Sequence, residues 1–253
     1  MAAETPGLFT PFMIQTTQAE NGRTRSLVLE GTLDGAQPGQ FVMVWLPGVG
    51  EKPFSLSGNA PLRLSVAAVG PFSAALAGLQ AGDRIWLRGP LGVGFALKGR
   101  HALLVGGGYG AAPLAFLARE ALKAGGTVRV LLGARTAAEL MLEEALRGLG
   151  CYVEVATEDG SRGSMGLVTA LAEQAIEQAR PDGVYACGPS GMLMTLWQLC
   201  QRAGLPAQLS FEGLVRCGVG LCGSCELPEE LCLRLGLAPG WLVCHDGPVC
   251  RLG

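Results

Sequence analysis

The strongest chemical signal in the sequence is a group of cysteines in its last forty or so residues. Cys217, Cys222 and Cys225 are separated by four and then two residues, and Cys244 follows Cys225 after 18 intervening residues. Thiolates at this spacing are typical of plant-type [2Fe–2S] sites, in which a tight loop surrounds one side of the cluster and a distant fourth thiolate completes it. The spacing therefore predicts that these four side chains bind a [2Fe–2S] cluster.

Three alternatives exist for these cysteines. A structural zinc site usually contains two CxxC-like pairs, which the four-residue gap does not provide. Disulfides are disfavoured because the N-terminus lacks the basic start and apolar core of a secretory signal, so a cytoplasmic location is expected. Cys232 could replace Cys244 as the fourth ligand, but it lies in "PEELCLRLGL", where the apolar face of a helix would bury it.

Two glycine-containing segments indicate a dinucleotide site. "GGGYGAAP" follows an apolar strand and opens a helix, so its backbone N–H groups can face a pyrophosphate, and "CGPSGM" also joins a strand to a helix. Ligands of open parallel sheets bind at the carboxyl ends of the strands, which places both segments at one crevice. The predicted NAD(H)-binding residues are Gly106, Gly107, Gly108, Gly110, Gly188, Pro189 and Arg135. Arg135 is either a ribose or phosphate ligand or a solvated loop charge.

The elements that must position these residues fall into three parts. Short apolar runs broken by Gly and Pro predict antiparallel strands, and strands that alternate with helices predict a parallel sheet. One of the expected helices covers residues 136–150. The predicted fold is a β-barrel domain (1–99), an α/β nucleotide-binding domain (100–212) and a small C-terminal [2Fe–2S] subdomain (213–253), the last too short to be stable without a staple.

Composition excludes some partners and suggests another. Charged residues make up 16% of the chain and the net charge is −2, so a nucleic-acid-binding surface is not expected. The uncharged run at residues 183–201, which is as long as any in the chain, is interrupted by Gly and Pro, so no membrane segment is expected either. Such a weakly charged chain has either an apolar surface covered by a partner protein or an unusually large core.

The chain resembles a known family through several segments in the same order. It resembles the ferredoxin reductase superfamily and, within it, the iron–sulfur electron-transfer subunits of NAD-dependent dihydroorotate dehydrogenase. The segments are "KPFSLSG", "AGDRIWLRGPLGVGF", "ALLVGGGYGAAPL", "EDGSRGSMGLVT", "YACGPSGML", "FEGLVRCGVGLCGSC" and "CHDGPVC". The last two are the most specific, because this cysteine spacing with its Cys-x-Asp-Gly-Pro-Val ending is typical of that subfamily.

The resemblance implies FAD between the barrel and the nucleotide domain. The matching positions are Lys52, Pro53, Phe54 and Ser55, then Ser65, Val66 and Ala67, and then Phe72 and Ser73. Lys52 stands where the family usually has arginine, which keeps the positive charge but loses the bidentate fork. Phe72 and Ser73 stand where it usually has glycine and threonine. The resemblance also places Cys187 beside the nicotinamide ring as a catalytic residue, with packing beneath the next helix as the alternative.

The resemblance implies an enzyme of pyrimidine biosynthesis that works as a heterotetramer. An FMN-containing dihydroorotate dehydrogenase catalytic subunit would oxidise dihydroorotate, and electrons would pass from FMN through the cluster and FAD to NAD. Two other functions remain open. The chain could serve a hydrogenase or a ferredoxin-linked transhydrogenase, or it could be a non-catalytic module whose cluster is a sensor or a structural staple.

Overall fold

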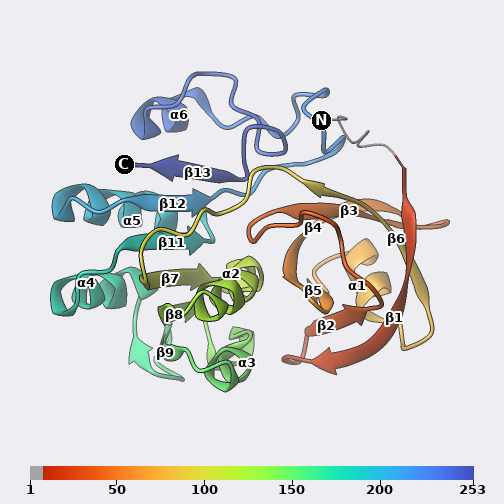
Figure 1. The fold of residues 1–253 in the computed structure, drawn as a ribbon, viewed down its shortest axis with the longest axis horizontal. Helices are drawn as coiled ribbons and strands as arrows, with labels where there is room; N and C mark the ends of the chain where they lie inside the picture. The colour runs from red at the N-terminus through yellow and green to blue at the C-terminus, as the bar shows by residue number, and fades with distance from the viewer. Residues whose placement is uncertain (1–7) are drawn as a thin grey trace. The chain divides into compact units, whose positions relative to one another are not determined.

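The computed structural model describes residues 8–253 and divides the chain into two units (Figure 1). The first unit contains the residues up to Gly94 together with Gly213–Pro248, and the second contains Phe95–Glu212 together with Val249–Gly253. No helix among the described residues has the length and apolar character needed to cross a membrane.

The first unit is built on a closed barrel of antiparallel strands. Alternation of side chains sends one set inward: in β5 the residues Leu62, Leu64 and Val66 are buried while those between them are partly exposed. The barrel order is β1-β2-β5-β4-β3-β6, and α1 (Pro71–Ala77) connects β5 to β6. The strands are β1 (Thr10–Ala19), β2 (Thr24–Leu29), β3 (Phe41–Leu46), β4 (Gly50–Asn59), β5 (Leu62–Ala67) and β6 (Arg84–Leu91).

The second unit is a seven-stranded sheet with helices packed against it (Figure 1). Its order is β10-β9-β8-β7-β11-β12-β13, and every pair is parallel except β12 with β13. Consecutive residues Leu103, Leu104 and Val105 are all buried, as expected for parallel strands covered on both faces. The strands are β7 (His101–Gly107), β8 (Thr127–Ala134), β9 (Tyr152–Thr157), β10 (Ser164–Met165), β11 (Gly183–Cys187), β12 (Ala207–Ser210) and β13 (Val249–Leu252). The helices are α2 (Ala111–Lys123), α3 (Glu143–Gly148), α4 (Val168–Gln178) and α5 (Ser190–Ala203).

The predicted barrel and parallel-sheet domain are confirmed, but residues 213–253 do not form a third compact unit. Gly213–Pro248 groups with the barrel, and β13 pairs with β12 at the edge of the sheet. The first boundary also lies earlier than residue 99. Phe95 packs edge-on against Tyr185 with ring centroids 6.0 Å apart, and the Lys98 amide donates to the Tyr185 hydroxyl at 2.7 Å, so these residues belong to the second unit.

The predicted continuous helix over residues 136–150 is wrong. The segment contains a 3₁₀ turn, η2 (Ala137–Glu139), and then the short helix α3. Between them Leu140, Met141 and Leu142 are all buried, and Leu142 has a φ of 61°. Three consecutive side chains cannot share one face of a helix, so the break lets all three enter the core.

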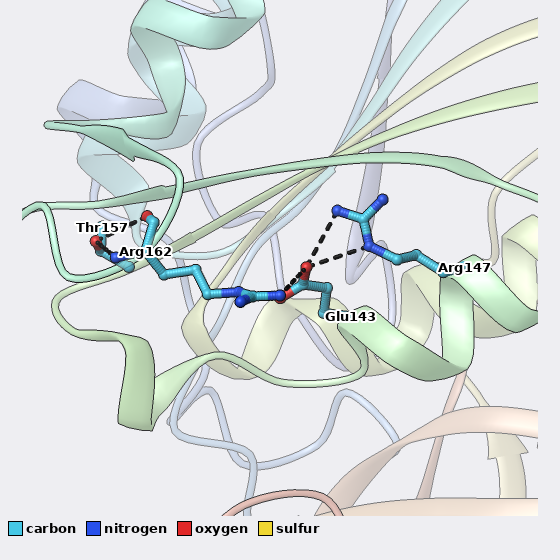
Figure 2. A network of polar contacts seen from close by, with 4 residues as sticks. All are labelled: Glu143, Arg147, Thr157 and Arg162. Carbon is cyan, nitrogen blue, oxygen red and sulfur yellow. Dashed lines mark hydrogen bonds and ion pairs between the residues drawn. The ribbon is translucent and has the colours of Figure 1, made fainter.

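A buried carboxylate joins α3 to the loop after β9 (Figure 2). Glu143 accepts hydrogen bonds from Arg162 at 3.0 Å and from Arg147 at 3.1 Å. The Arg162 amide donates to the Thr157 hydroxyl, which in turn donates to the Arg162 carbonyl, each at 3.0 Å. The Arg162 guanidinium holds the pKa of Glu143 below its usual range, although burial opposes this.

We expect Glu143→Gln to lower the free energy of unfolding by about 1–3 kcal/mol at pH 7, because two guanidinium groups lose their carboxylate. Because the pKa of Glu143 is lower in the folded state than its unfolded-state value of about 4.3, its carboxylate stabilises the folded state above that pH. This stabilisation is lost as the pH falls through the folded-state pKa. The difference between wild type and variant in urea denaturation should therefore shrink below about pH 4. Glu173→Gln is the control, since Glu173 forms an exposed pair with Arg202. Equal loss in both variants at pH 7 would contradict the expectation.

Candidate functional site

The four predicted cluster ligands lie together in the barrel-containing unit, as two adjacent pairs of thiols. The side chains of Cys217 and Cys222 hydrogen-bond to each other, as do those of Cys225 and Cys244. The Cys244 amide also donates to the Cys225 sulfur at 3.4 Å. Cys225 and Cys244 are buried, whereas Cys222 is exposed at the surface of the loop.

Glycines allow this loop to approach its neighbours closely. Gly218 has a φ of 72°, and a Cβ there would lie 3.1 Å from side-chain atoms of Met43 and Leu91 in the barrel. Gly220 has a φ of 77°, and a Cβ there would lie 3.0 Å from His245, the residue after Cys244. The Gly220 amide donates to the Cys244 sulfur at 3.2 Å, so the turn brings a backbone N–H group to a predicted ligand.

Backbone amides also favour the thiolate form of the first cysteine. Burial raises the pKa of the Cys217 thiol, but the N–H groups of Val219, Cys222 and Leu221 outweigh it and lower the pKa to about 6. Burial and the neighbouring Cys225 instead raise the pKa of Cys244 to about 12. Metal binding requires deprotonated thiols, so the turn supplies part of the stabilisation that a bound cluster needs.

The donor set suits a cluster of two irons. Within residues 8–253, no three side chains of His, Cys, Asp or Glu are grouped as a site for a single metal ion. Two thiol pairs are present instead, and four cysteines shared between two irons is the ligand set of a [2Fe–2S] cluster. Cys232 is buried in α6 (Glu229–Leu235), as predicted, with its thiol 3.8 Å from the Leu227 carbonyl.

The two predicted dinucleotide-binding segments meet at the carboxyl edge of the second unit's sheet. Gly106 in β7 is the register partner of Cys187 in β11. A Cβ at Gly110 would overlap the Cys187 carbonyl, and one at Gly107 would lie 3.0 Å from Pro189. A turn, η1 (Gly108–Gly110), then leads into α2, so the free N–H groups of the helix start lie at this edge.

Cys187 is located at this edge but belongs to the core of the unit. It is 6% exposed, its thiol hydrogen-bonds with Ser210 at the end of β12, and the Glu212 carboxylate is nearby. Burial raises its pKa to about 12, so the thiol is neutral. Sequence reasoning missed Ser210 and Glu212, although their position after β12 at the same edge could have indicated them.

Arg135 is exposed and paired. Its guanidinium donates to both carboxylate oxygens of Glu139, at 3.1 and 2.8 Å, and this pairing raises its pKa. Glu158 and Tyr109 also interact with it electrostatically. Four side chains thus gather after the ends of β7, β8 and β9.

The residues assigned to FAD by resemblance occupy β4, β5 and α1. Lys52 is exposed, and Phe54 stacks with Phe72 at a centroid distance of 6.1 Å. The side chain of Val66 is buried in the barrel, so only its main chain is available to a ligand. The Ser73 hydroxyl accepts hydrogen bonds from the Val69 and Gly70 amides at the start of α1.

The remaining positions of this set contribute a small polar group. The Ser65 hydroxyl contacts that of Ser57 at 3.1 Å and that of Ser26 at 3.2 Å. Pro53, Ser55 and Ala67 are each partly exposed on their strands.

Comparisons with known proteins agree with this geometry. Residues 104–196 match the family described as the oxidoreductase NAD-binding domain. The probable dihydroorotate dehydrogenase B (NAD(+)) electron transfer subunit of Methanopyrus kandleri is 40% identical over 215 residues, covering 84% of this chain and 78% of that protein. The protein of the same name from Pyrococcus horikoshii is 42% identical over 217 residues, covering 84% of this chain and 78% of its own.

Solved structures show the same fold. One, from a study of flavin-based electron bifurcation by an NADH-dependent reduced ferredoxin–NADP oxidoreductase, has a TM-score of 0.80 and 28% identity, covering 97% of this chain and 89% of that one. The flavohem-like FAD/NAD-binding domain of Vibrio cholerae nitric oxide dioxygenase has a TM-score of 0.67 and 23% identity, covering 77% and 93%. The extent and identity of the sequence matches place this chain in the family of dihydroorotate dehydrogenase B (NAD(+)) electron transfer subunits.

Proposed function

We propose that this chain carries electrons between NAD(H) and a partner flavoprotein by way of FAD and a [2Fe–2S] cluster. The observation that carries the proposal is that one chain contains two features. Four cysteine thiols lie together in two pairs, and a glycine-rich turn at the edge of a parallel sheet leads into the start of α2. The first suits one-electron chemistry and the second suits a dinucleotide. When bound, FAD supplies the hydride chemistry that links the two.

The chain's own residues would hold and orient these groups. Cys217, Cys222, Cys225 and Cys244 are the proposed cluster ligands. Amides of the turn after Gly106 and of the start of α2 would face the NAD diphosphate. Lys52 would place a positive charge near the FAD diphosphate, and the remaining assigned positions of β4, β5 and α1 would line the flavin.

We infer that the partner is an FMN-containing catalytic subunit that oxidises dihydroorotate in the cytoplasm. Relatives named as electron transfer subunits of dihydroorotate dehydrogenase B support the partner, and the nine cysteine thiols, which a reducing compartment preserves, support the compartment. Residues 214–225 form the cysteine loop, which contains Cys217, Cys222 and Cys225. Two of its apolar side chains, Leu214 and Leu221, are 59% and 86% exposed, which provides apolar surface for a partner.

Purification of the native complex tests the assignment of the partner. We expect a co-purifying subunit that contains FMN and, with this chain, reduces NAD at the expense of dihydroorotate. A second candidate is favoured by the likeness to the reduced ferredoxin–NADP oxidoreductase structure, which covers 97% of this chain. A companion subunit that oxidises reduced ferredoxin, with no dihydroorotate activity, would select that candidate.

We expect Lys52→Ala to weaken FAD binding about tenfold, because a cation near the flavin diphosphate is lost. Binding is measured by fluorescence titration of flavin-depleted protein. Lys123→Ala removes another exposed lysine, paired with Glu120 in the other unit, and should leave the affinity unchanged. Equal affinities in wild type and Lys52→Ala would remove Lys52 from the proposed flavin site.

We expect Cys187→Ala to slow reduction of the flavin by NADH about tenfold, because a group that orders the reacting centre is lost while both cofactors stay bound. The rate is measured by stopped-flow absorbance. Cys200→Ala is a matched control, since Cys200 is a buried free thiol in α5. If both variants keep the wild-type rate, Cys187 is a packing residue only.

A further inference from the structure

Arg88 is a buried cation on the outer side of the barrel. It lies in β6, where Ile85 and Leu87 point into the barrel core, so strand alternation sends Arg88 outward. It is nevertheless only 9% exposed. A buried guanidinium is costly unless it is paired and fully hydrogen-bonded, so its partners are informative.

The partners of Arg88 connect a barrel strand to the cysteine loop. The same nitrogen, Nη2, donates to Glu51 Oε1 at 2.8 Å and to the Cys217 carbonyl at 2.9 Å. The guanidinium also lies over the ring of Phe9, 5.5 Å from its centroid. Cys217 is the first of the four proposed cluster ligands, and Glu51 directly precedes Lys52 in β4.

A second contact fixes the same point of the loop. A Cβ at Gly218 would lie 3.1 Å from both Met43 and Leu91, so the chain after Cys217 rests directly on β3 and β6. The peptide that joins Cys217 to Gly218 is planar, so holding its carbonyl also sets the direction of its N–H group. The turn that begins there aims the amides of Val219 and Leu221 at the Cys217 thiol.

We propose that Arg88 is a positioning residue for the [2Fe–2S] cluster, which it serves by fixing the Cys217 backbone and by placing positive charge near the cluster. The inference rests on the proposed function, because it requires the four thiols to bind that cluster. Reduction adds one negative charge to the cluster, so a nearby guanidinium favours the reduced state. Glu51 balances part of this charge.

Arg88→Gln and Arg88→Lys, compared with Arg129→Gln, test the proposal. Arg129 is a close match, because it pairs with Glu154 at 2.7 Å and lies 5.5 Å from the ring centroid of Tyr152, but in the other unit. We expect Arg88→Gln to lose iron to a chelator about tenfold faster than wild type and to have a more negative cluster potential. Arg88→Lys keeps the positive charge, so its cluster potential should be close to that of wild type. Arg129→Gln should match wild type both in the rate of iron loss and in the cluster potential.

Glu51→Gln provides a variant that keeps the bond from Arg88 to the Cys217 carbonyl. Loss of the balancing carboxylate should make the cluster potential more positive, whereas Glu154→Gln should not change it. If Arg88→Gln does not accumulate as folded protein, the potential of Glu51→Gln decides the question. The role of Arg88 alone would be overturned if cluster-loaded Arg88→Gln and Glu51→Gln had the same rate of iron loss and the same cluster potential as the Arg129→Gln and Glu154→Gln controls. A wild-type protein that binds no cluster would overturn the proposed function, and this inference with it.

Discussion

Replacing Cys244 by serine should abolish or severely destabilise the [2Fe–2S] cluster. Cys244 is buried, and its sulfur accepts a hydrogen bond from the Gly220 amide at 3.2 Å beside Cys225. A serine hydroxyl is a poor replacement for a thiolate ligand, so one iron would lose half of its protein ligands. We expect iron and acid-labile sulfide to fall from about two of each per chain to near zero, with loss of the visible cluster bands.

Cys232→Ser is the matched control, because Cys232 is a buried cysteine of the same unit. Its thiol hydrogen-bonds with the Leu227 carbonyl at 3.8 Å, and it lies on the buried face of α6. This variant should keep its full iron and sulfide content. An unchanged cluster in Cys244→Ser, or loss of the cluster in Cys232→Ser alone, would contradict the proposed ligand set.

Replacing Gly110 by alanine should weaken NADH binding by about tenfold or more. Gly110 has a φ of −62°, which alanine adopts readily, so backbone strain is not the cause. The added Cβ would overlap the Cys187 carbonyl and lie 2.9 Å from the Gly188 amide. Backbone cannot move aside as the end of a flexible side chain can, so the two turns at the sheet edge must separate.

Gly148→Ala is the control for a glycine in the same unit. Gly148 lies at the end of α3 with nothing within 4 Å of its Cβ position, so alanine there should leave NADH affinity unchanged and slightly raise stability. Affinity is measured by isothermal titration. If Gly110→Ala and Gly148→Ala bind NADH equally well, the close approach at Gly110 has no part in dinucleotide binding.

Much of the fold could be predicted because periodicity reports local burial. The alternating apolar residues of β5 fit a strand and not a helix. The apolar run of β7, the glycine turn after it and the helical periodicity of α2 likewise each fit one kind of secondary structure. The helix expected over residues 136–150 failed because its apolar residues Leu140 to Leu142 are consecutive, which a helix cannot bury together. Pairing of β13 with β12 depends on tertiary contacts that no local pattern encodes.

The site likewise contains some features that the local sequence predicts and others that depend on tertiary contacts. Four cysteines could be proposed as cluster ligands because cluster ligation depends on residue type and spacing, and the structure brings their thiols together in two pairs. Burial of Cys232 followed from helical periodicity. The bond from Arg88 to the Cys217 carbonyl joins residues 129 positions apart, so only the folded chain reveals it. Likewise, the placement of Val66 in the barrel core shows that a matching motif position need not offer its side chain to a ligand.

The central claim is that this chain exchanges electrons between NAD(H) and a [2Fe–2S] cluster by way of FAD. Its most direct test is an anaerobic titration of the cofactor-loaded protein with NADH, followed by visible absorption and by electron paramagnetic resonance. We expect the flavin absorption to bleach and the signal of a reduced [2Fe–2S] cluster to appear in the same samples. Flavin and cluster that are both present and stay oxidised with excess NADH would contradict the claim.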